Sequence, residues 1–164
     1  MKGAVYYHSK WGNCKEVAEA IAKGLSESGY DIELTAIEAD TRPPADLDFI
    51  VVGSPTRVGK ATRNARRFIK RNIDDGWKDR KFAAFGTGLA SAREKSEPQS
   101  ADHIYWLLCD RGLKPLAEPF KAAVDGMKGP LAQGELLKSV KFGFELGESL
   151  AKAGEWGVIG KRED

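Results

Sequence analysis

The segment Ser9-Lys10-Trp11-Gly12-Asn13-Cys14 carries residue types that can bind a phosphate group. It lies between an apolar run, residues 4–7, and an amphipathic run. A strand that leads through a glycine-containing turn into a helix directs several backbone N–H groups at one point, where the helix N-terminus favours an anion. Ser9 and Asn13 add side-chain donors, and Lys10 adds positive charge. The alternative is an ordinary strand-to-helix turn capped by Ser or Asn, and this segment alone does not decide between the two.

Two further loops of small and polar residues follow apolar runs of the chain. Residues 47–52 are almost continuously apolar, which is typical of a strand covered on both faces, and the loop Gly53 to Lys60 follows them. A third strand and loop lie within residues 81–89, which end in Gly86-Thr87-Gly88-Leu89. The chain therefore has three loops rich in Gly, Ser and Thr, each placed after a strand.

The remaining segments alternate between helical and strand patterns. Apolar residues at helical spacing predict helices over residues 14–28, 61–73, 101–112 and 133–153. Residues 31–37 alternate with period two, so we expect that strand at one edge of the sheet. A last strand is predicted over residues 114–120, and Pro115 and Pro119 place it at the other edge.

This alternation predicts an α/β fold in three layers, with a doubly wound, five-stranded parallel sheet of strand order 2-1-3-4-5. In such a sheet the ligand lies beyond the carboxyl ends of the strands, at the switch point between the first and third strands. We therefore expect the three loops to meet at one rim. The length of 164 residues predicts a single domain, assigned to residues 1–160, with a C-terminal tail over residues 161–164.

Charge and composition argue against several classes of protein. The formal net charge is only +2, which does not support nucleic-acid binding by overall electrostatics. No signal-peptide pattern and no run of membrane-span length is present, so we expect a cytoplasmic protein. Cys14 and Cys109 lack the spacing of a zinc site. Gly53 and Gly59 lie too far apart for a P-loop, and Ala20 stands where a low-molecular-weight phosphatase needs an Arg.

The sequence resembles the flavodoxin family over nearly its whole length. The segment Ser9 to Cys14 is similar to the family's FMN-phosphate loop, usually Ser/Thr-x-Thr-Gly-Asn-Thr. Gly53-Ser54-Pro55-Thr56 is similar to the start of its second flavin loop, and Phe85-Gly86-Thr87-Gly88 to its third. Gly129-Pro130-Leu131 and Gly134-Glu135-Leu136 are similar to the approach to its last helix. The four motifs follow the family's order, which makes the resemblance fairly specific.

The resemblance implies that the chain binds FMN and shuttles electrons between redox partner proteins, with no side chain in an acid–base role. The implied FMN-binding residues are Ser9, Lys10, Trp11, Gly12, Asn13 and Cys14 in the first loop, Ser54, Pro55, Thr56, Arg57, Val58 and Gly59 in the second, and Thr87, Gly88 and Leu89 in the third. Two alternatives stay open: an FMN-dependent reductase acting with NAD(P)H or a quinone, and a flavin-free interaction domain.

Two features of the loops depart from the family pattern. Trp11 and Cys14 replace threonines, so two phosphate-binding hydroxyls are missing, although the Trp11 indole N–H can donate one hydrogen bond. The second and third loops contain no aromatic residue that could stack on the flavin. We therefore expect the ring to pack on Val58, Leu89 or Trp11.

Basic residues gather in two places. Arg57, Lys60 and Arg93 are expected near the flavin ring, where they would make its second reduction step less negative in potential. The predicted helix over residues 61–73 has no acidic residue. We expect an acidic redox partner, such as a ferredoxin-like protein or a reductase, to dock near Arg63, Arg66, Arg67 and Lys70, although a solvated face gives the same pattern. The chain is expected to be a monomer or a weak dimer.

Five residues are interpreted mainly as structural. Trp77 and Trp106 are predicted to pack against the core. His103 is predicted on a helix surface without a role, and His8 as a structural or partly exposed residue. Cys14 lies at a predicted helix N-terminus, where a thiol can have a lowered pKa and be reactive, but a small residue that fits the turn is the simpler interpretation.

Overall fold

The structure, a computed structural model, describes residues 1–163. Its strands are β1 (Lys2–Tyr7), β2 (Asp31–Ala36), β3 (Phe49–Arg57), β4 (Lys60–Ala61), β5 (Lys81–Leu89), β6 (Lys114–Pro115) and β7 (Phe120–Val124). Its helices are α1 (Asn13–Glu27), α2 (Arg63–Asn72), α3 (Ala90–Glu94), α4 (Ser100–Asp110) and α5 (Glu135–Glu163), with a 3-10 turn η1 (Asp75–Trp77). The predicted tail boundary at residue 160 stays a prediction: helical backbone continues to Glu163, and Asp164 lies outside the described residues.

The sheet has the predicted strand order and more strands than predicted. The strands run β2-β1-β3-β5, and both β6 and β7 pair with the far side of β5. These pairs are all parallel, whereas β4 turns back and pairs with β3 in an antiparallel hairpin. The described residues therefore form seven strands in place of five. The last strand lies at the predicted edge, but its predicted extent was wrong: within residues 114–119 only Lys114–Pro115 pairs with β5, and the main pairing comes after Pro119, which lacks the N–H that a ladder needs, in Phe120–Val124.

Two strands also continue further than predicted. The parallel pairing of β3 with β5 extends through Ser54↔Gly86 and Pro55↔Thr87, in segments that were assigned to loops. Gly86 leaves room for the N-terminus of α4 to pack on this extension, because a Cβ at Gly86 would lie 2.0 Å from the Ser100 hydroxyl. The sheet thus reaches the rim itself, and the site is built partly on strand ends.

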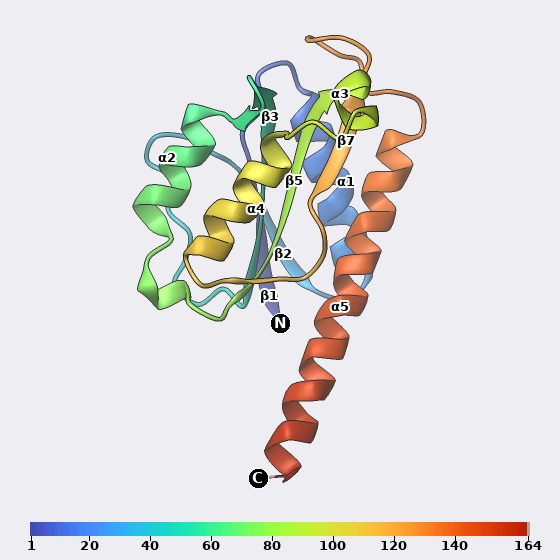
Figure 1. The fold of residues 1–164 in the computed structure, drawn as a ribbon. Helices are drawn as coiled ribbons and strands as arrows, with labels where there is room; N and C mark the ends of the chain where they lie inside the picture. The colour runs from blue at the N-terminus through green and yellow to red at the C-terminus, as the bar shows by residue number, and fades with distance from the viewer. Residues whose placement is uncertain (164) are drawn as a thin grey trace.

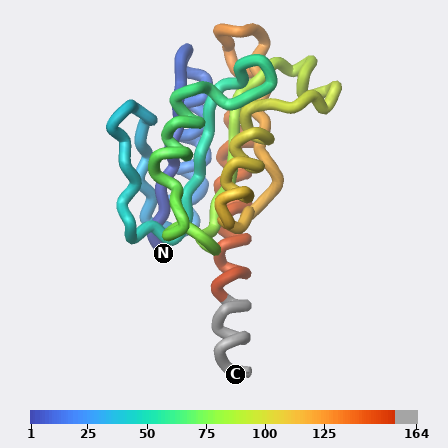
Figure 2. Tube along the Cα trace, turned by 60° about the vertical axis from the view of Figure 1, so that its left-hand side comes forward, coloured from blue at the N-terminus to red at the C-terminus, as the bar shows by residue number. Residues whose placement is uncertain are grey.

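Helices cover both faces of the sheet, so the molecule has two cores (Figure 1). On one face, α2 and α4 bury Phe68, Ile69 and Ile104 against alternate strand residues such as Tyr6 and Phe82. On the other face, α1 and α5 pack on the strand residues between these, which include Val51, Phe85 and Ala122. This alternation is what a parallel sheet covered on both sides requires. Figure 2 shows that the loops after β1, β3, β5 and β7 all lie at the end of the sheet opposite the N-terminus.

Helices α1 and α5 pack through glycines at backbone contact. A Cβ at Gly143 would lie 2.3 Å from the Ile21 carbonyl oxygen and 3.0 Å from the Cα of Gly24. Reciprocally, a Cβ at Gly24 would lie 2.3 Å from the Val140 carbonyl oxygen. The two backbones can lie this close only because neither position carries a side chain. The contact holds α1, and therefore the loop that precedes it, against the sheet.

We predict that Gly143→Ala destabilises the protein, because the methyl group must push two backbones apart, at a cost of about 1–3 kcal/mol. The matched control is Gly154→Ala in the same helix, where a Cβ would meet nothing within 4 Å. That change should be neutral or stabilise by up to about 1 kcal/mol, because alanine favours the helix. Urea denaturation followed by circular dichroism measures both. Equal effects of the two changes would contradict the proposed contact.

Candidate functional site

The first loop is shaped as an anion cradle at the N-terminus of α1. Gly12 precedes the helix in the left-handed conformation, with φ of 91°, which favours glycine. The Ser9 hydroxyl oxygen accepts hydrogen bonds from the N–H groups of Gly12 (3.1 Å) and Lys15 (3.3 Å). These bonds fix the loop and leave the Ser9 hydroxyl hydrogen free to donate. Because the first N–H groups of a helix have no partner within it, those of Asn13 and Cys14 are available to an anion.

The loop after β7 closes one side of this cradle. The Asn13 side-chain amide donates to the Lys128 carbonyl oxygen at 3.1 Å, and a Cβ at Gly129 would overlap the same side chain. Two ammonium groups lie over the Trp11 ring, with Lys10 Nζ at 5.2 Å and Lys128 Nζ at 5.0 Å from its centroid. Both contacts are within cation–π range. They place two positive charges beside the loop, where they would attract a phosphate.

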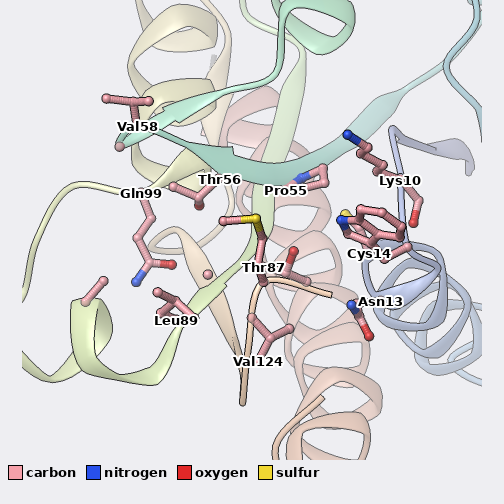
Figure 3. A pocket seen from close by; sticks show the side chains of 16 residues that line it. Lys10, Asn13, Cys14, Pro55, Thr56, Val58, Thr87, Leu89, Gln99 and Val124 are labelled. Atoms are coloured by element: carbon pink, nitrogen blue, oxygen red, sulfur yellow. The ribbon is translucent and has the colours of Figure 1, made fainter. Parts of the chain in front are cut away.

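A cavity of about 300 Å³ extends from this loop along the rim of the sheet. Pro55, Thr56 and Val58 lie on one side of it and Leu89 and Val124 on the other, with the first loop at one end (Figure 3). The predicted residues that line it are Ser9, Lys10, Trp11, Asn13, Cys14, Pro55, Thr56, Val58, Gly59, Thr87, Gly88 and Leu89. Twelve of the fifteen predicted residues are thus brought together, and their role in binding stays a prediction.

The other three predicted residues lie around the cavity without lining it. Gly12 gives the first loop its shape at the start of α1, and Arg57 is exposed next to the tip of the β3–β4 hairpin. Ser54 is fully buried beneath the site. Its hydroxyl oxygen accepts from the Thr62 N–H at 3.2 Å, and its carbonyl oxygen accepts from the Ser100 hydroxyl at 2.7 Å. Ser54 therefore joins β3 to α4 and to the N-cap of α2 under the cavity floor.

The β3–β4 hairpin forms one wall of the cavity and has a strained tip. Arg57 pairs with Lys60, so Val58 and Gly59 form a two-residue turn with φ of 49° and 75°. A β-branched residue is rare in this left-handed region, and Val58 is fully exposed. The base of the hairpin is fixed by Thr56, whose hydroxyl donates to the Ser100 hydroxyl oxygen at 3.1 Å and accepts from the Ser100 N–H at 3.0 Å.

The two histidines of the chain contact the return strand of this hairpin and the residue that follows it. The Nδ1 atom of His103 accepts from the Ala61 N–H at 3.1 Å, which gives His103 a structural role that the sequence did not indicate. The Nδ1 atom of His8 lies 2.8 Å from the Thr62 hydroxyl oxygen. Burial lowers the pKa of both imidazoles, with a further contribution from Arg57 at His8 and from Arg66 at His103.

Two other expectations need correction, those for Arg93 and Trp106. Arg93 does not lie free near a ring site: its guanidinium donates to the buried Glu135 carboxylate and to the Lys121 carbonyl oxygen. Cys14 is buried, and burial raises the pKa of its thiol, which agrees with the simpler interpretation of a small residue that fits the turn. Trp77 packs in the core as predicted, whereas Trp106 is 55% exposed.

Four lining residues were not predicted: Ala92, Gln99, Val124 and Met127. Val124 and Met127 were missed because the last strand was ended at Phe120, although the apolar run before Asp125-Gly126 has the pattern of a strand that reaches the rim. Gln99 precedes α4 by one residue and faces the site because Ser100 is tied to β3. No pattern in the sequence singles out Gln99.

These residues fit a ligand with a phosphate at one end and a flat, largely apolar ring system at the other. The cradle supplies backbone donors, the Ser9 hydroxyl and two ammonium groups. The slot beyond it is lined by apolar side chains with a few polar groups, which is typical of cofactor sites. FMN has this distribution of groups. Among the described residues, no cluster of side chains could hold a metal ion, and no helix has both the length and the apolar character needed to cross a bilayer.

Comparison with known proteins points to one family. A family model described as a flavodoxin domain matches residues 4–114. A diflavin flavoprotein from Thermosynechococcus vestitus is 30% identical over 150 residues, which cover 85% of this chain and 25% of that protein. An NAD(P)H dehydrogenase (quinone) from Acidithiobacillus ferrooxidans is 36% identical over 89 residues, 41% of this chain and 44% of that one. The chain thus spans a quarter to under half of these relatives.

A solved archaeal flavodoxin structure shares the fold. It superposes with a TM-score of 0.76 over 92% of this chain and 99% of that chain, at 20% sequence identity. At this identity the likeness concerns the fold, and it extends beyond the end of the segment that the family model matches.

We predict that the stability of the protein falls as the pH is lowered from 7.5 to 5. The pKa of each histidine is lowered by folding, so the unfolded chain binds more protons below about pH 6.5, and acid favours unfolding. Urea denaturation at several pH values measures the slope. His103→Asn keeps an acceptor for the Ala61 N–H without titrating, so it should reduce the slope. An unchanged slope in the His8→Asn, His103→Asn double variant would refute the assignment.

Proposed function

The chain belongs to the flavodoxin family, and we propose that it binds FMN in the cavity described above and carries electrons between redox partner proteins. Flavodoxin-like domains bind flavin and serve electron transfer, and FMN is the cofactor of the family. The observation that carries the proposal for this chain is the anion cradle at the N-terminus of α1, continuous with an apolar slot at the carboxyl ends of the strands.

One set of residues would bind the phosphate end of the cofactor, and another set would bind its ring. The N–H groups at the start of α1, the Ser9 hydroxyl and the ammonium groups of Lys10 and Lys128 would hold the phosphate. Pro55, Val58 and Leu89 would enclose the ring and exclude water from its faces. The bound flavin supplies the redox chemistry, because it can take up and release one or two electrons.

The lining of the cavity favours a carrier over a catalyst with its own acid or base. Its titratable residues are Lys10, which lies at the phosphate end, and Cys14, whose thiol is buried with a raised pKa. Exposed apolar side chains, Val58, Leu89 and Met127, surround its mouth. Such a rim can contact a partner directly while the flavin lies behind it.

The partner would dock on the α2 side of this mouth. Arg63, Arg66 and Lys70 project from α2, and its ten residues include no acidic one. Between the β3–β4 hairpin and α4, a groove of about 460 Å³ is lined by Val58, Gly59, Lys60, Glu97, Pro98, His103 and Trp106. Its exposed Trp106 can take an apolar side chain of a partner, and the surrounding cations favour an acidic surface. We therefore propose an acidic redox protein as the partner.

An FMN-dependent reductase is the second candidate. The observation that favours it is the similarity to an NAD(P)H dehydrogenase (quinone) over 89 residues. The same groove adjoins the flavin cavity through Val58 and Gly59 and could admit a small acceptor. Steady-state turnover of NADPH with a quinone by the FMN-loaded protein would favour this candidate, whereas fast reduction by a protein donor alone favours the carrier.

We predict that FMN binds with a visible spectral change and that Gly12→Ala raises its dissociation constant about tenfold or more. Alanine disfavours a φ of 91°, so the cradle must change shape. Riboflavin, which lacks the phosphate, should bind both proteins equally. The matched control is Gly29→Ala, with φ of 96° at the other end of α1 and equally free of contacts. A wild-type protein that ignores FMN would indicate a flavin-free domain.

We predict that the double variant Arg66→Glu, Lys70→Glu slows electron transfer from an acidic [2Fe–2S] ferredoxin about tenfold at low ionic strength. The difference should shrink in 0.5 M salt, because screening removes the steering. Stopped-flow reduction of the bound flavin measures the rate. The control variant Lys23→Glu, Lys141→Glu changes the net charge equally on α1 and α5, across the sheet, and should leave the rate near wild type. Equal slowing by both variants would mean that α2 is not the docking surface.

A further inference from the structure

The side-chain NH2 group of Gln99 is a buried donor without a partner beside the proposed flavin site, whereas the rest of the residue forms a capping box with Asp102 at the start of α4. Gln99 is 1% exposed, and its Nε2 atom has no hydrogen-bond acceptor in the described part of the chain. Its backbone N–H is satisfied by the Asp102 carboxylate at 2.8 Å. Buried amide groups of this kind are nearly always paired in native proteins, so an unpaired one needs an explanation.

The surroundings of the carboxamide offer room but no acceptor. A Cβ at Gly88 would lie 2.3 Å from Gln99 Oε1, so the glycine creates the space that the amide occupies. The nearby Thr56 hydroxyl is already engaged in two bonds with Ser100. Figure 3 shows the carboxamide between Thr56 and Leu89, at the end of the cavity opposite Lys10 and Asn13.

We propose that Gln99 donates a hydrogen bond to a carbonyl oxygen of the flavin pyrimidine ring, and so fixes the ring in the cavity with its carbonyl-bearing edge toward Gln99. The proposal rests on FMN binding, the proposed function. The geometry agrees with the cofactor, because a phosphate in the cradle leaves the ring to extend toward Gln99. The carbonyl-bearing edge of the ring is polar and needs donors in an otherwise apolar slot.

The bond should also change the reduction potential of the cofactor. Reduction adds electron density to the pyrimidine edge, so a donor at that edge binds the reduced ring more strongly than the oxidised ring. Loss of the donor therefore weakens the binding of both forms and weakens that of the reduced form more. If the additional loss for the reduced form is tenfold, the two-electron midpoint potential becomes about 30 mV more negative.

The test is Gln99→Leu, which keeps the size of the side chain and removes the donor. We expect about a tenfold rise in the dissociation constant of both FMN and riboflavin, together with a more negative midpoint potential. Gln99→Leu also removes the side-chain acceptor that caps α4, so some loss of stability to urea without ligand is expected whatever the role of the donor. A purely structural role for Gln99 would show that loss of stability with the midpoint potential of the bound flavin unchanged. Gln99→Met serves the same purpose where Leu is not accommodated.

Two controls separate the possible failures. Asp102→Asn weakens the bond to the Gln99 backbone but leaves the carboxamide, so it should change flavin affinity less than twofold. Gly12→Ala acts at the phosphate end and should affect FMN but not riboflavin. Flavin binding and potential unchanged in Gln99→Leu would overturn the role of Gln99 and leave the proposed function intact. A wild-type protein that binds neither flavin would overturn both.

Discussion

One row of paired residues across the sheet fixes the position along the strands at which every loop of the site begins. Tyr7 pairs with Gly53, Gly53 with Phe85, and Phe85 with Phe120. The row is locked because the Phe85 ring occupies the space over Gly53, where a Cβ would lie 2.3 Å away. A shift of one residue in any strand would turn its core residues toward the wrong face. The four loops therefore leave the sheet at the same edge, and together they enclose the cavity.

A buried polar network converts this apolar sheet into a site. Ser54, Thr56 and Ser100 exchange hydrogen bonds at the point where β3 leaves the core. His103 bonds to Ala61 in β4, and His8 bonds to Thr62, which follows β4. Buried polar groups that satisfy each other specify one arrangement of the chain. The strained Val58–Gly59 turn persists because its base is fixed in this way.

The sequence was sufficient for the parts of the molecule that follow from periodicity. Continuous apolar runs identified the central strands, and the rule that ligands bind at the carboxyl ends of parallel strands brought three loops to one rim. The end of the last strand was predicted wrongly because Pro115 and Pro119 indicated an edge strand that stops near them, whereas the apolar residues after Pro119 form the main pairing with β5. The place of Gln99 in the cavity and the contacts of His103 and Arg93 could not be predicted, since each depends on a partner distant in sequence: β3, through Ser100, for Gln99, Ala61 for His103 and Glu135 for Arg93.

The Val58–Gly59 turn is a shared wall between the proposed flavin cavity and the groove beside α4. Thermodynamic linkage follows from this shared wall, because a ligand on either side that alters the turn alters the affinity on the other side by the same factor. A protein that docks in the groove and displaces this turn would therefore also change the affinity of the cavity for flavin. Where that change differs between the oxidised and reduced cofactor, docking also changes the driving force for the electron transfer that follows.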